Sequence, residues 1–395
     1  MPLRFMTAGE SHGPGLTAIL EGMPSGLAID PAAVDAELAR RQAGYGRGGR
    51  MRIEKDRAEF TGGVRHGRTL GSPIAVHIPN LDFEHWRDAM APFGHAPVPA
   101  KRVVTAPRPG HADLAGGAKH GFRDLRDVLE RASARETAAR VAVGAIARQL
   151  LEAFGVSIVS HVRTLGPVTS VVRVPEDCAW SEVRARAAAN DLGCLDAGSY
   201  AEMVRAITAA KERGDTLGGV VEVAALGLPV GLGSHVHWDR KLDGRIAQAL
   251  MSIQAVKGVE IGPAFENATL PGSAVHDAVH KDASGRMCRS QNRAGGLEGG
   301  ITNGEPLVAR VAMKPLSTLM KPLDTVDIQS GKATQAAVER SDVCAVTACG
   351  VVAEAMLALA LADAWLEKFS GDSVDEVRAA FERHVAEVAR WSGSS

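Results

Sequence analysis

The chain has 395 residues, of which 45% are apolar, and its formal net charge at pH 7 is −1. This apolar fraction excludes global disorder, and the near-neutral charge argues against a general binder of nucleic acid or of anionic membranes. The five cysteines are odd in number and follow no metal-ligand spacing, so neither a disulfide framework nor a structural zinc site is predicted.

The N-terminal segment shows no apolar signal region, and no apolar run of about 20 residues is seen. We therefore expect a soluble protein of the reducing cytoplasm. Glycine is abundant, with 43 residues that fall in clusters, which indicates many turns and places where backbone approaches a ligand.

The hydrophobic pattern predicts strands and helices along most of the chain. In the first part we expect strands at 3–8 and 16–20, a helix at 30–42 that begins at an Asp-Pro pair, antiparallel strands over 51–79 and irregular chain over 80–110. In the rest we expect helices at 131–154, 201–213, 240–256 and 340–367, strands at 156–162, 257–262 and 306–314, and irregular chain at 165–200 and 284–305. No clean linker separates these elements, so a single domain over 1–395 is predicted, with residues 371–395 as an amphipathic helical tail within it.

Two segments carry the pattern G-x-T-L-G immediately before an apolar strand, at 67–71 and at 214–218. A five-residue match can arise by chance. The shared strand context is also what an internal duplication produces, so both explanations stay open.

The stretch at 130–146 is the most distinctive in the chain, because its first half is rich in charge and hydroxyl groups and its second half is small and apolar. If one helix begins near Arg131, its free N–H groups and its dipole favour an anion at the polar end, where Ser133, Arg135 and Thr137 add donors. The alanine and glycine residues of the second half let another backbone approach closely. The plainer alternative is a capped helix with a solvated first turn.

Arginines recur in glycine-rich or cap-like contexts, and their planar guanidinium groups suit carboxylates and phosphates. They are Arg41, Arg47, Arg50, Arg108, Arg131, Arg135, Arg293 and Arg340. Each one alone reads as a surface residue, but together they indicate a small ligand with several negative charges. His12 and His111 each lie in a loop rich in glycine and proline, where a near-neutral imidazole can exchange a proton.

Other interpretations of these residues have less support. Ser11 lacks the G-x-S-x-G elbow of a nucleophilic serine, and Glu10 and Asp113 near the histidines form no recognised metal motif. Asp342, at a predicted helix start, can serve as an N-cap. No Walker A motif is present, and the one G-x-G-x-x-G, at 44–49, follows a helix, so a common kinase or a Rossmann dehydrogenase is not supported. The residues predict an enzyme that binds a polyanionic small molecule and uses histidine acid–base chemistry, without fixing the reaction.

Four motifs resemble those of the chorismate synthase family, in the same order and at similar separations. They are G-E-S-H-G at 9–13, R-P-G-H-A-D at 108–113, R-A-S-A-R-E-T-A at 131–138 and R-S-D-V-C at 340–344. The segments at 214–219 and 295–300 also look like family segments, and A-G-Y-G-R-G-G-R at 43–50 resembles the bacterial branch. The resemblance covers about residues 3–370, and several long motifs in order are far more specific than a lone glycine pattern.

The resemblance implies a carbon–oxygen lyase of the shikimate pathway, which leads to the aromatic amino acids. Such an enzyme converts 5-enolpyruvylshikimate 3-phosphate to chorismate and phosphate by a 1,4-anti elimination, and it needs reduced FMN although no net redox change occurs. The implied fold is an α/β multilayer sandwich of antiparallel or mixed β-sheets and helices with an internal pseudo-repeat, commonly assembled as a homotetramer. Reduced FMN is expected from an external flavin reductase or reductant, with NADPH acting only indirectly. No metal, nucleic-acid or membrane partner is expected.

The same match implies roles for individual residues. The implied catalytic residues are His12, His111 and Asp342. Those implied to bind substrate are Ser11, Arg41, Arg47, Arg108, Ser133, Arg135, Glu136 and Arg340. Those implied to bind FMN are Arg131, Ala132, Ser133, Gln254, Ala255, Gly299, Lys314, Pro315, Leu316, Ser317, Thr318 and Arg340. Arg41 and Arg47 can also be assigned to NADP in such chains, but substrate binding is the better physical use of both.

In the implied mechanism the flavin acts as a transient electron donor that helps phosphate to leave. His111 protonates or stabilises the reduced flavin, His12 supplies a proton near the departing phosphate, and Asp342 assists flavin N5 in taking the C6 proton. Two alternatives stay open: a non-flavin phosphate-transferring enzyme with the same anion pocket, and a protein that binds an anionic metabolite or contacts RNA through its Gly-Arg loop.

Overall fold

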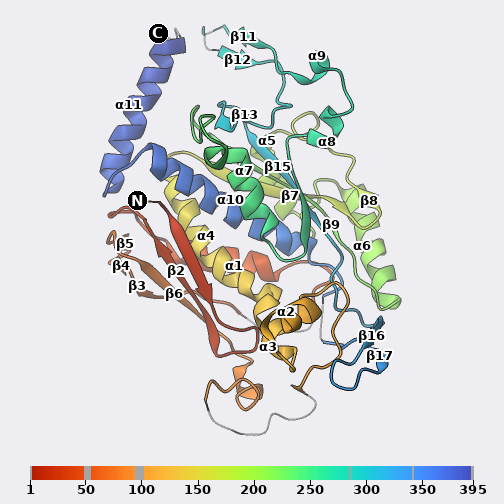
Figure 1. Cartoon of the computed structure of the whole chain (residues 1–395). Coiled ribbons are helices and arrows are strands. Elements are labelled where there is room, and N and C mark those ends of the chain that lie inside the picture. Colours follow the sequence, from red (N-terminus) through yellow and green to blue (C-terminus); the bar gives the residue numbers. More distant parts are fainter. Residues whose placement is uncertain are drawn as a thin grey trace.

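A layer of helices separates two β-sheets in the computed structural model, which describes residues 2–48, 55–93, 102–283, 285, 287–339 and 342–392 (Figure 1). The first sheet contains β1 (Arg4–Ala8), β2 (Gly15–Glu21), β3 (Glu59–Gly62) and β6 (Ile74–Pro79), in the order β1-β2-β6-β3. The second contains β7 (Ser157–Leu165), β8 (Val168–Thr169), β9 (Gly219–Leu226), β10 (Val256–Ile261) and β15 (Leu307–Met313), in the order β10-β15-β9-β7-β8. The strand pairs of both sheets are antiparallel.

Short two-stranded ladders extend from these sheets and carry several of the loops. They are β4 (Val64–Arg65) with β5 (Arg68–Thr69), β11 (Val279–Lys281) with β12 (Met287–Arg289), β13 (Leu297–Glu298) with β14 (Ile301–Thr302), and β16 (Asp324–Val326) with β17 (Ala333–Gln335).

Two long helices, α4 (Thr137–Glu152) and α10 (Val346–Lys368), form the centre of the helical layer. α4 packs on the first sheet, α10 packs on the second, and the two helices pack on each other, as Figure 1 shows. α1 (Pro31–Gln42) lies against both, and α7 (Leu242–Met251) packs on α10 and β10. The other helices are α2 (Asp113–His120), α3 (Arg126–Ala132), α5 (Trp180–Ala188), α6 (Ala197–Glu212), α8 (Ala264–Asn267), α9 (Gly272–Val275) and α11 (Val374–Ser392), with 3₁₀ turns η2 (Phe83–His85), η4 (Ala134–Glu136) and η5 (Trp238–Arg240).

Most of the predicted elements are present with shifted ends. At α1 the local prediction is confirmed, because Pro31 takes the first helical position and the Asp30 side chain accepts the Ala32 N–H at 2.9 Å. The prediction of irregular chain over 165–200 is wrong in part, since α5 forms there and buries Trp180 and Val183 against a small apolar cluster.

The two halves of the chain follow the same order of strand, strand, helix, strand, strand, helix if the two-stranded ladders and strand β8 are left out together with the helices that have no counterpart, among them α5 and α6 between β7 and β9 and α11 after α10. The first half runs β1, β2, α1, β3, β6, α4 and the second runs β7, β9, α7, β10, β15, α10. Both sheets place their four corresponding strands in the same spatial order. The G-x-T-L-G segments do not follow this correspondence, because the segment at 67–71 precedes β6, the fourth strand of its set, whereas that at 214–218 precedes β9, the second.

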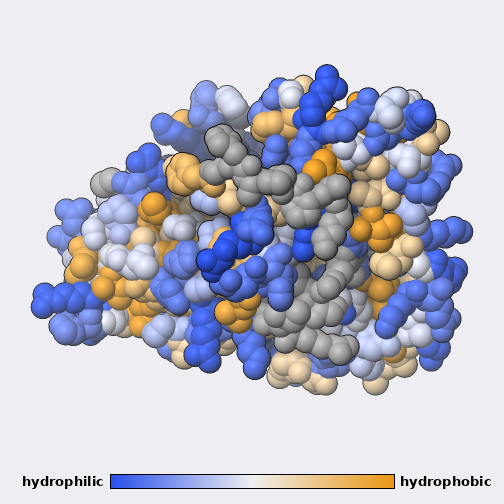
Figure 2. All heavy atoms as spheres, turned by 90° about the horizontal axis from the view of Figure 1, so that it is seen from below, coloured by the Kyte–Doolittle hydropathy of each residue, from blue (hydrophilic) through white to orange (hydrophobic). Residues whose placement is uncertain are grey.

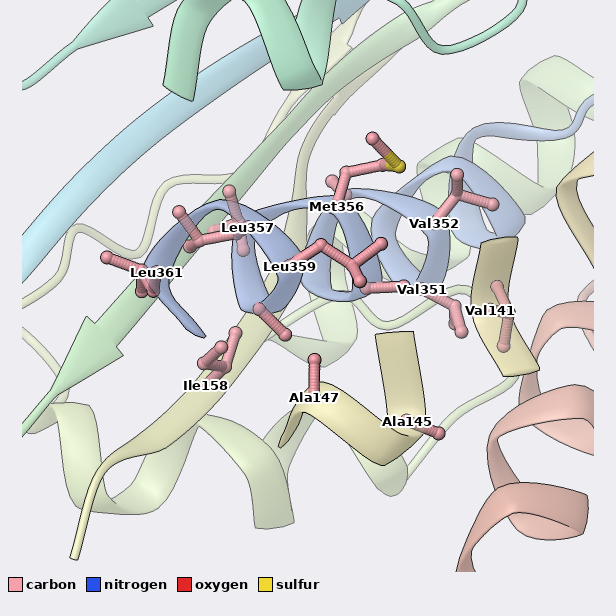
Figure 3. Close-up of a cluster of buried hydrophobic side chains, with 14 of the residues drawn as sticks. Val141, Ala145, Ala147, Ile158, Val351, Val352, Met356, Leu357, Leu359 and Leu361 are labelled. Carbon is pink, nitrogen blue, oxygen red and sulfur yellow. The ribbon is translucent and has the colours of Figure 1, made fainter. Parts of the chain in front are cut away.

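The contact between α4 and α10 is close because small residues line it. A Cβ added to Gly144 would lie 2.5 Å from the Cβ and 2.7 Å from the Cα of Ala355, so the glycine lets the helices meet backbone to backbone. Around it pack the apolar side chains of Figure 3, which come from both helices and from β7 at Ile158. The expectation that another backbone approaches the small-residue half of the 130–146 stretch is confirmed.

One buried carboxylate ties this layer together. Glu354 of α10 accepts hydrogen bonds from Arg40 at 2.9 and 3.0 Å, from Arg148 at 2.9 Å and from the Ser160 hydroxyl at 2.6 Å. Burial acts to raise the pKa of Glu354, but Arg148, Arg40 and Ser160 lower it to about 2. The group is therefore ionised in the folded protein and joins α1, α4, β7 and α10.

Helix α10 is long and apolar enough to cross a membrane by length and composition. Its most apolar window is 83% buried inside the protein, as expected for the core helix of a sandwich. No other helix of the described residues meets the same criteria.

We expect Gly144→Ala to destabilise the fold by about 1–3 kcal/mol, because the methyl group overlaps the backbone of α10 and the layers must shift apart. Urea unfolding followed by circular dichroism measures the change. The matched control is Gly244→Ala in α7, where an added Cβ meets nothing within 4 Å and about 0.5–1 kcal/mol of stabilisation is expected. Equal effects of the two substitutions would contradict the close contact.

We expect Glu354→Gln to cost about 1–3 kcal/mol at pH 7, because it weakens the charged hydrogen bonds of a buried carboxylate to Arg148 and Arg40, while Glu37 still pairs with both arginines. The folded-state pKa of Glu354 lies below its ordinary value of 4.5, so its stabilisation is present above that pH and is lost as the pH falls toward about 2. The difference between the two proteins in urea unfolding should therefore shrink below pH 4.5. A difference independent of pH would contradict an ionised Glu354, and Glu202→Gln on the exposed face of α6 serves as control.

Candidate active site

The residues that the sequence singles out gather mainly at the end of the molecule formed by α2 and α3. Figure 2 views the molecule from this end and shows hydrophilic side chains at the centre of the face. The loop after β1, the segment around α2 and α3, and the loop after β15 meet here. The Ser11 N–H donates to the Glu130 carbonyl at 3.1 Å, and Arg108 donates to the Thr318 hydroxyl at 2.9 Å, so these segments are joined by hydrogen bonds.

The chain does not form one helix over 131–154. It leaves α3 at Ser133, where ψ is 144°, makes the turn η4 and then begins α4 at Thr137. The Ser133 hydroxyl accepts the Arg135 N–H at 3.3 Å, and such a local cap competes with continuation of the helix. Arg131 and Ala132 consequently lie in the last turn of α3, so the prediction that Arg131 starts a helix is wrong.

The side chains around this break hold the loop that follows β1. Arg131 donates to the Thr7 carbonyl at 2.9 Å and to its hydroxyl at 2.8 Å. The Ser133 hydroxyl donates to the Ser11 hydroxyl at 3.1 Å. Ser11, Arg131 and Ser133 are therefore brought together, as the sequence predicts.

His12 is held on its ring edge, on its ring face and at its backbone. Its Nδ1 lies 2.8 Å from Oε1 of Glu130, and its backbone N–H donates to Oε2 of the same carboxylate at 2.8 Å. The indole of Trp86 stacks on the imidazole with ring centres 3.8 Å apart. Arg126, one turn before Glu130 in α3, donates to Oε1 at 2.9 Å. A His–carboxylate–Arg arrangement results.

His111 has the same kind of environment. Its Nδ1 lies 2.5 Å from Oδ1 of Asp113, which is fully buried at the start of α2. Arg108 donates to Oδ1 at 3.1 Å and to Oδ2 at 2.8 Å through its side chain, and to Oδ2 at 3.1 Å through its backbone N–H. The motif R-P-G-H-A-D thus folds back on its own aspartate.

The histidine and arginine partners of Glu130 and Asp113 favour the ionised form of both carboxylates. Burial acts to raise the pKa of Glu130, but His12 and Arg126 hold it below its ordinary value. Burial likewise opposes the shift at Asp113, where His111 and Arg108 hold the pKa well below its usual range.

Two buried arginines share a single carboxylate behind η4. Arg135 donates to Asp56, and Nη1 of Arg41 lies 3.6 Å from the same carboxylate. Arg41 also donates to the Thr137 hydroxyl at 2.8 Å and to the Ala134 carbonyl at 3.0 Å. Arg41, Asp56 and Arg135 thus form a buried cluster of charged groups, and its arginines carry N–H donors of the kind that suit carboxylates and phosphates.

Arg47 and Asp342 form a second pair near this position. Nε of Arg47 lies 3.3 Å from Oδ2 of Asp342, and the Gly48 N–H donates to Oδ1 at 2.6 Å. Because α10 begins at Val346, Asp342 is not its N-cap, so the N-cap interpretation is wrong. Asp342 instead holds the Gly-Arg loop. Arg340 and Arg50 lie outside the described residues.

Glu136 and Gln254 are joined across the site. Gln254 donates to Oε2 of Glu136 at 2.9 Å, the Thr7 hydroxyl donates to Oε1 at 2.6 Å, and Arg140 donates to both oxygens. The buried Oε1 of Gln254 has no partner among the described residues. Ala255 has a left-handed φ of 68°, which costs an L-residue free energy and marks a backbone held by its surroundings.

The loop after β15 carries the predicted Lys-Pro-Leu-Ser-Thr segment to the same place. The Lys314 N–H donates to the Ala255 carbonyl at 2.9 Å, and the Leu316 carbonyl accepts the Thr216 hydroxyl at 2.7 Å. Lys314 and Ser317 lie beside Gly110, two residues after Arg108. Burial and the nearby Lys257 lower the pKa of Lys314. Pro315 completes this loop between β15 and β16.

Gly299 lies apart from the other predicted flavin residues. It forms the turn between β13 and β14 beside His235, and Figure 1 shows β13 at the end of the molecule opposite α2 and α3.

Several residues of the site have no predicted role in the sequence. Glu130, Asp56 and Trp86 belong to none of the expected sets, and Asp113 is considered only as a metal neighbour. The four-residue spacing of Arg126 and Glu130 on one helix is the one local signal that could have indicated their pairing. Within the described part of the chain, no group of three or more His, Cys, Asp or Glu side chains is arranged to hold a metal ion.

Known proteins resemble this chain over almost its whole length. A family model described as chorismate synthase matches residues 3–366. A chorismate synthase of Trichlorobacter lovleyi is 55% identical over 391 residues, which cover 97% of this chain and 99% of the relative. That of Moorella thermoacetica is 55% identical over 389 residues, covering 98% and 100%. A crystal structure of a chorismate synthase superposes with a TM-score of 0.78 at 44% identity, covering 98% of both chains. The chain therefore belongs to the chorismate synthase family.

Proposed function

We propose that the side chains around the break at Ser133 bind the substrate and the reduced flavin of this family's reaction. The chain is a lyase that eliminates phosphate from 5-enolpyruvylshikimate 3-phosphate to give chorismate, the reaction of the shikimate pathway that precedes the aromatic amino acids. The observation that carries the assignment of the site is the presence of two histidine–carboxylate pairs together with a cluster of buried arginines.

The residues present fit FMN. The chemistry of the donor set is that of a phosphate and polyol site, since Lys314, Ser317 and Thr318 supply a cation and two hydroxyls. The buried Oε1 of Gln254 has no partner among the described residues and can accept from a bound flavin. Arg131, Ala132, Ser133, Ala255, Pro315 and Leu316 complete the proposed flavin residues of this part of the chain.

The arginines account for the charge of the substrate, which carries two carboxylates and a phosphate. Arg41, Arg47, Arg108 and Arg135 are proposed to bind these groups, with Ser11, Ser133 and Glu136 as further polar contacts and Arg340 as a member outside the described residues. Substrate binding remains our proposal for Arg41 and Arg47 in preference to NADP.

When bound, reduced FMN supplies transient electron density to the allylic system of the substrate. His12 is proposed to give a proton to an oxygen of the leaving phosphate, and His111 to hold a proton beside the cofactor. Asp342, whose oxygens are held by Arg47 and the Gly48 N–H, is proposed to assist removal of the substrate's C6 proton. The reductant that restores FMN is proposed to be external, with NADPH acting only through it.

We further propose a cytoplasmic homotetramer in which residues 1–395 form one domain, with 371–395 as its helical tail. The separation of Gly299 from the other flavin residues of its own chain supports an assembly in which another copy supplies this glycine. The matching element order of the two halves supports an internal pseudo-repeat.

Anaerobic turnover of the enolpyruvyl substrate with photoreduced FMN tests the function, with phosphate release as the readout. We expect His12→Ala and His111→Ala to lower turnover by about 10²–10⁴-fold, the usual contribution of acid–base help, while circular dichroism shows an intact fold. The matched control is His237→Ala, an exposed histidine of the loop before η5. Full activity of either site variant would contradict the acid–base role proposed for the replaced histidine.

We expect Gln254→Ala to weaken FMN binding about fivefold, since it removes about one hydrogen bond worth near 1 kcal/mol. Titration of the flavin absorbance measures the dissociation constant. Gln149→Ala is the control, because Gln149 lies on α4 and bonds Asp30 instead. An unchanged constant would remove Gln254 from the flavin site.

A further inference from the structure

The two proposed catalytic histidines share an arrangement that involves groups without an assigned role. In each case Nδ1 faces a buried carboxylate that also accepts from an arginine. His12 faces Glu130, with Arg126 on the same Oε1, and His111 faces Asp113.

The position of one proton on each imidazole follows from this geometry. An ionised carboxylate can only accept hydrogen bonds, so Nδ1 of His12, 2.8 Å from Glu130, carries the proton between the two atoms. Nδ1 of His111 also lies 3.1 Å from Nη2 of Arg108, but its 2.5 Å contact with Asp113 would be repulsive between two acceptors, so this nitrogen carries a proton too. The alternative places the proton on the carboxyl group. The lowered pKa values of Glu130 and Asp113 oppose that alternative.

We propose that Glu130 and Asp113 are positioning residues that fix a proton on Nδ1 of His12 and His111 and leave Nε2 of each ring to exchange protons with the ligands. This inference rests on the proposed function of the two histidines. Neither carboxylate touches the reacting atoms in this account.

The surroundings of Glu130 hold both its carboxylate and the His12 ring in place. Its two oxygens receive three donors: the His12 backbone N–H, the His12 Nδ1–H and the Arg126 guanidinium. Trp86 stacks on the imidazole and fixes the ring plane, and the Arg102 guanidinium lies 3.5 Å from the centre of the Trp86 ring. The imidazole is therefore held in one orientation, and its side chain is 13% exposed.

A third histidine, His161, has partners of the same kinds, a carboxylate and an arginine, and provides a contrast within the chain. In the second sheet, Nε2 of His161 lies 3.1 Å from Glu222, which also accepts from Arg310. The His161 side chain is fully buried, so this set has no access to a ligand. Replacing Glu222 therefore measures the effect of losing such a carboxylate on the stability of the fold alone.

The sharpest variant is Glu130→Leu. The apolar side chain accepts no hydrogen bond, so nothing holds the proton on Nδ1 of His12 and the tautomer with the proton on Nε2 becomes accessible. Glutamine is less informative, because its amide oxygen can keep both the Nδ1–H and Arg126 at the Oε1 position. We expect kcat to fall about 10²–10⁴-fold with KM within about threefold, because the acid–base group is wrongly protonated while the substrate arginines are intact.

Asp113→Asn should differ in a predictable way. Asp113 also holds Arg108, a proposed substrate residue, so this variant should lower kcat and raise KM together. Glu222→Gln, the matched control, should lower thermal stability and leave kcat and KM unchanged.

Two measurements separate positioning from general structural support. Nitrogen-15 spectra of histidine-labelled enzyme report which ring nitrogen carries the proton, and we expect the Nδ1–H signal of His12 to be lost in Glu130→Leu. In a double-mutant cycle, Glu130→Leu should cost nothing further in kcat when His12→Ala is already present. Glu130→Asp, which keeps the charge, should restore part of kcat.

The possible failures are distinguishable. If the Nδ1–H signal persists in Glu130→Leu, or if the losses in the cycle multiply, Glu130 does not act through His12 and the inference is overturned. If His12→Ala alone keeps full activity, the proposed function of His12 fails, although the spectra can still show that Glu130 sets its tautomer.

Discussion

The close contact between α4 and α10 is the constraint on which the rest of the structure depends. Two sheets can share one layer of helices only if the central helices pack tightly, and Gly144 against Ala355 provides that closeness. Glu354 then fixes the relative position of the layers by bonding to α1, α4 and β7 at once. A rigid α4 in turn gives a fixed start at Thr137, and the break before it places Arg135 and Ser133 beside the loop that carries His12.

The site combines two kinds of charge arrangement with different purposes. The histidine–carboxylate–arginine sets hold imidazole rings in place, whereas Arg41 and Arg135 hold the chain at η4 and at the start of α4. Arg41 does so through the Thr137 hydroxyl and the Ala134 carbonyl, and Arg135 through Asp56. The guanidinium groups of both arginines are therefore kept in fixed, buried positions.

Short linear motifs made much of the site predictable from the sequence. R-P-G-H-A-D keeps Arg108, His111 and Asp113 within six positions, and the family resemblance places the arginines of the other motifs. The role of Glu130 could not be read in the same way, because its partner His12 lies 118 residues away. Asp56 is likewise 79 residues from Arg135. The break at Ser133 was missed because residues on either side favour helix, and only the serine cap and the tertiary contacts of Arg131 end it.

The left-handed backbone at Ala255 has a consequence for how this protein can be improved. Holding an alanine there costs on the order of 1–2 kcal/mol, which is a sizeable part of the net stability of an ordinary domain. The Lys314 N–H bonds to the carbonyl of that residue, so the same turn that is strained also fixes the loop beside Arg108. Selection for thermostability alone would favour relaxing this turn, and thermostability and the fixed position of the loop after β15 therefore compete at a single residue.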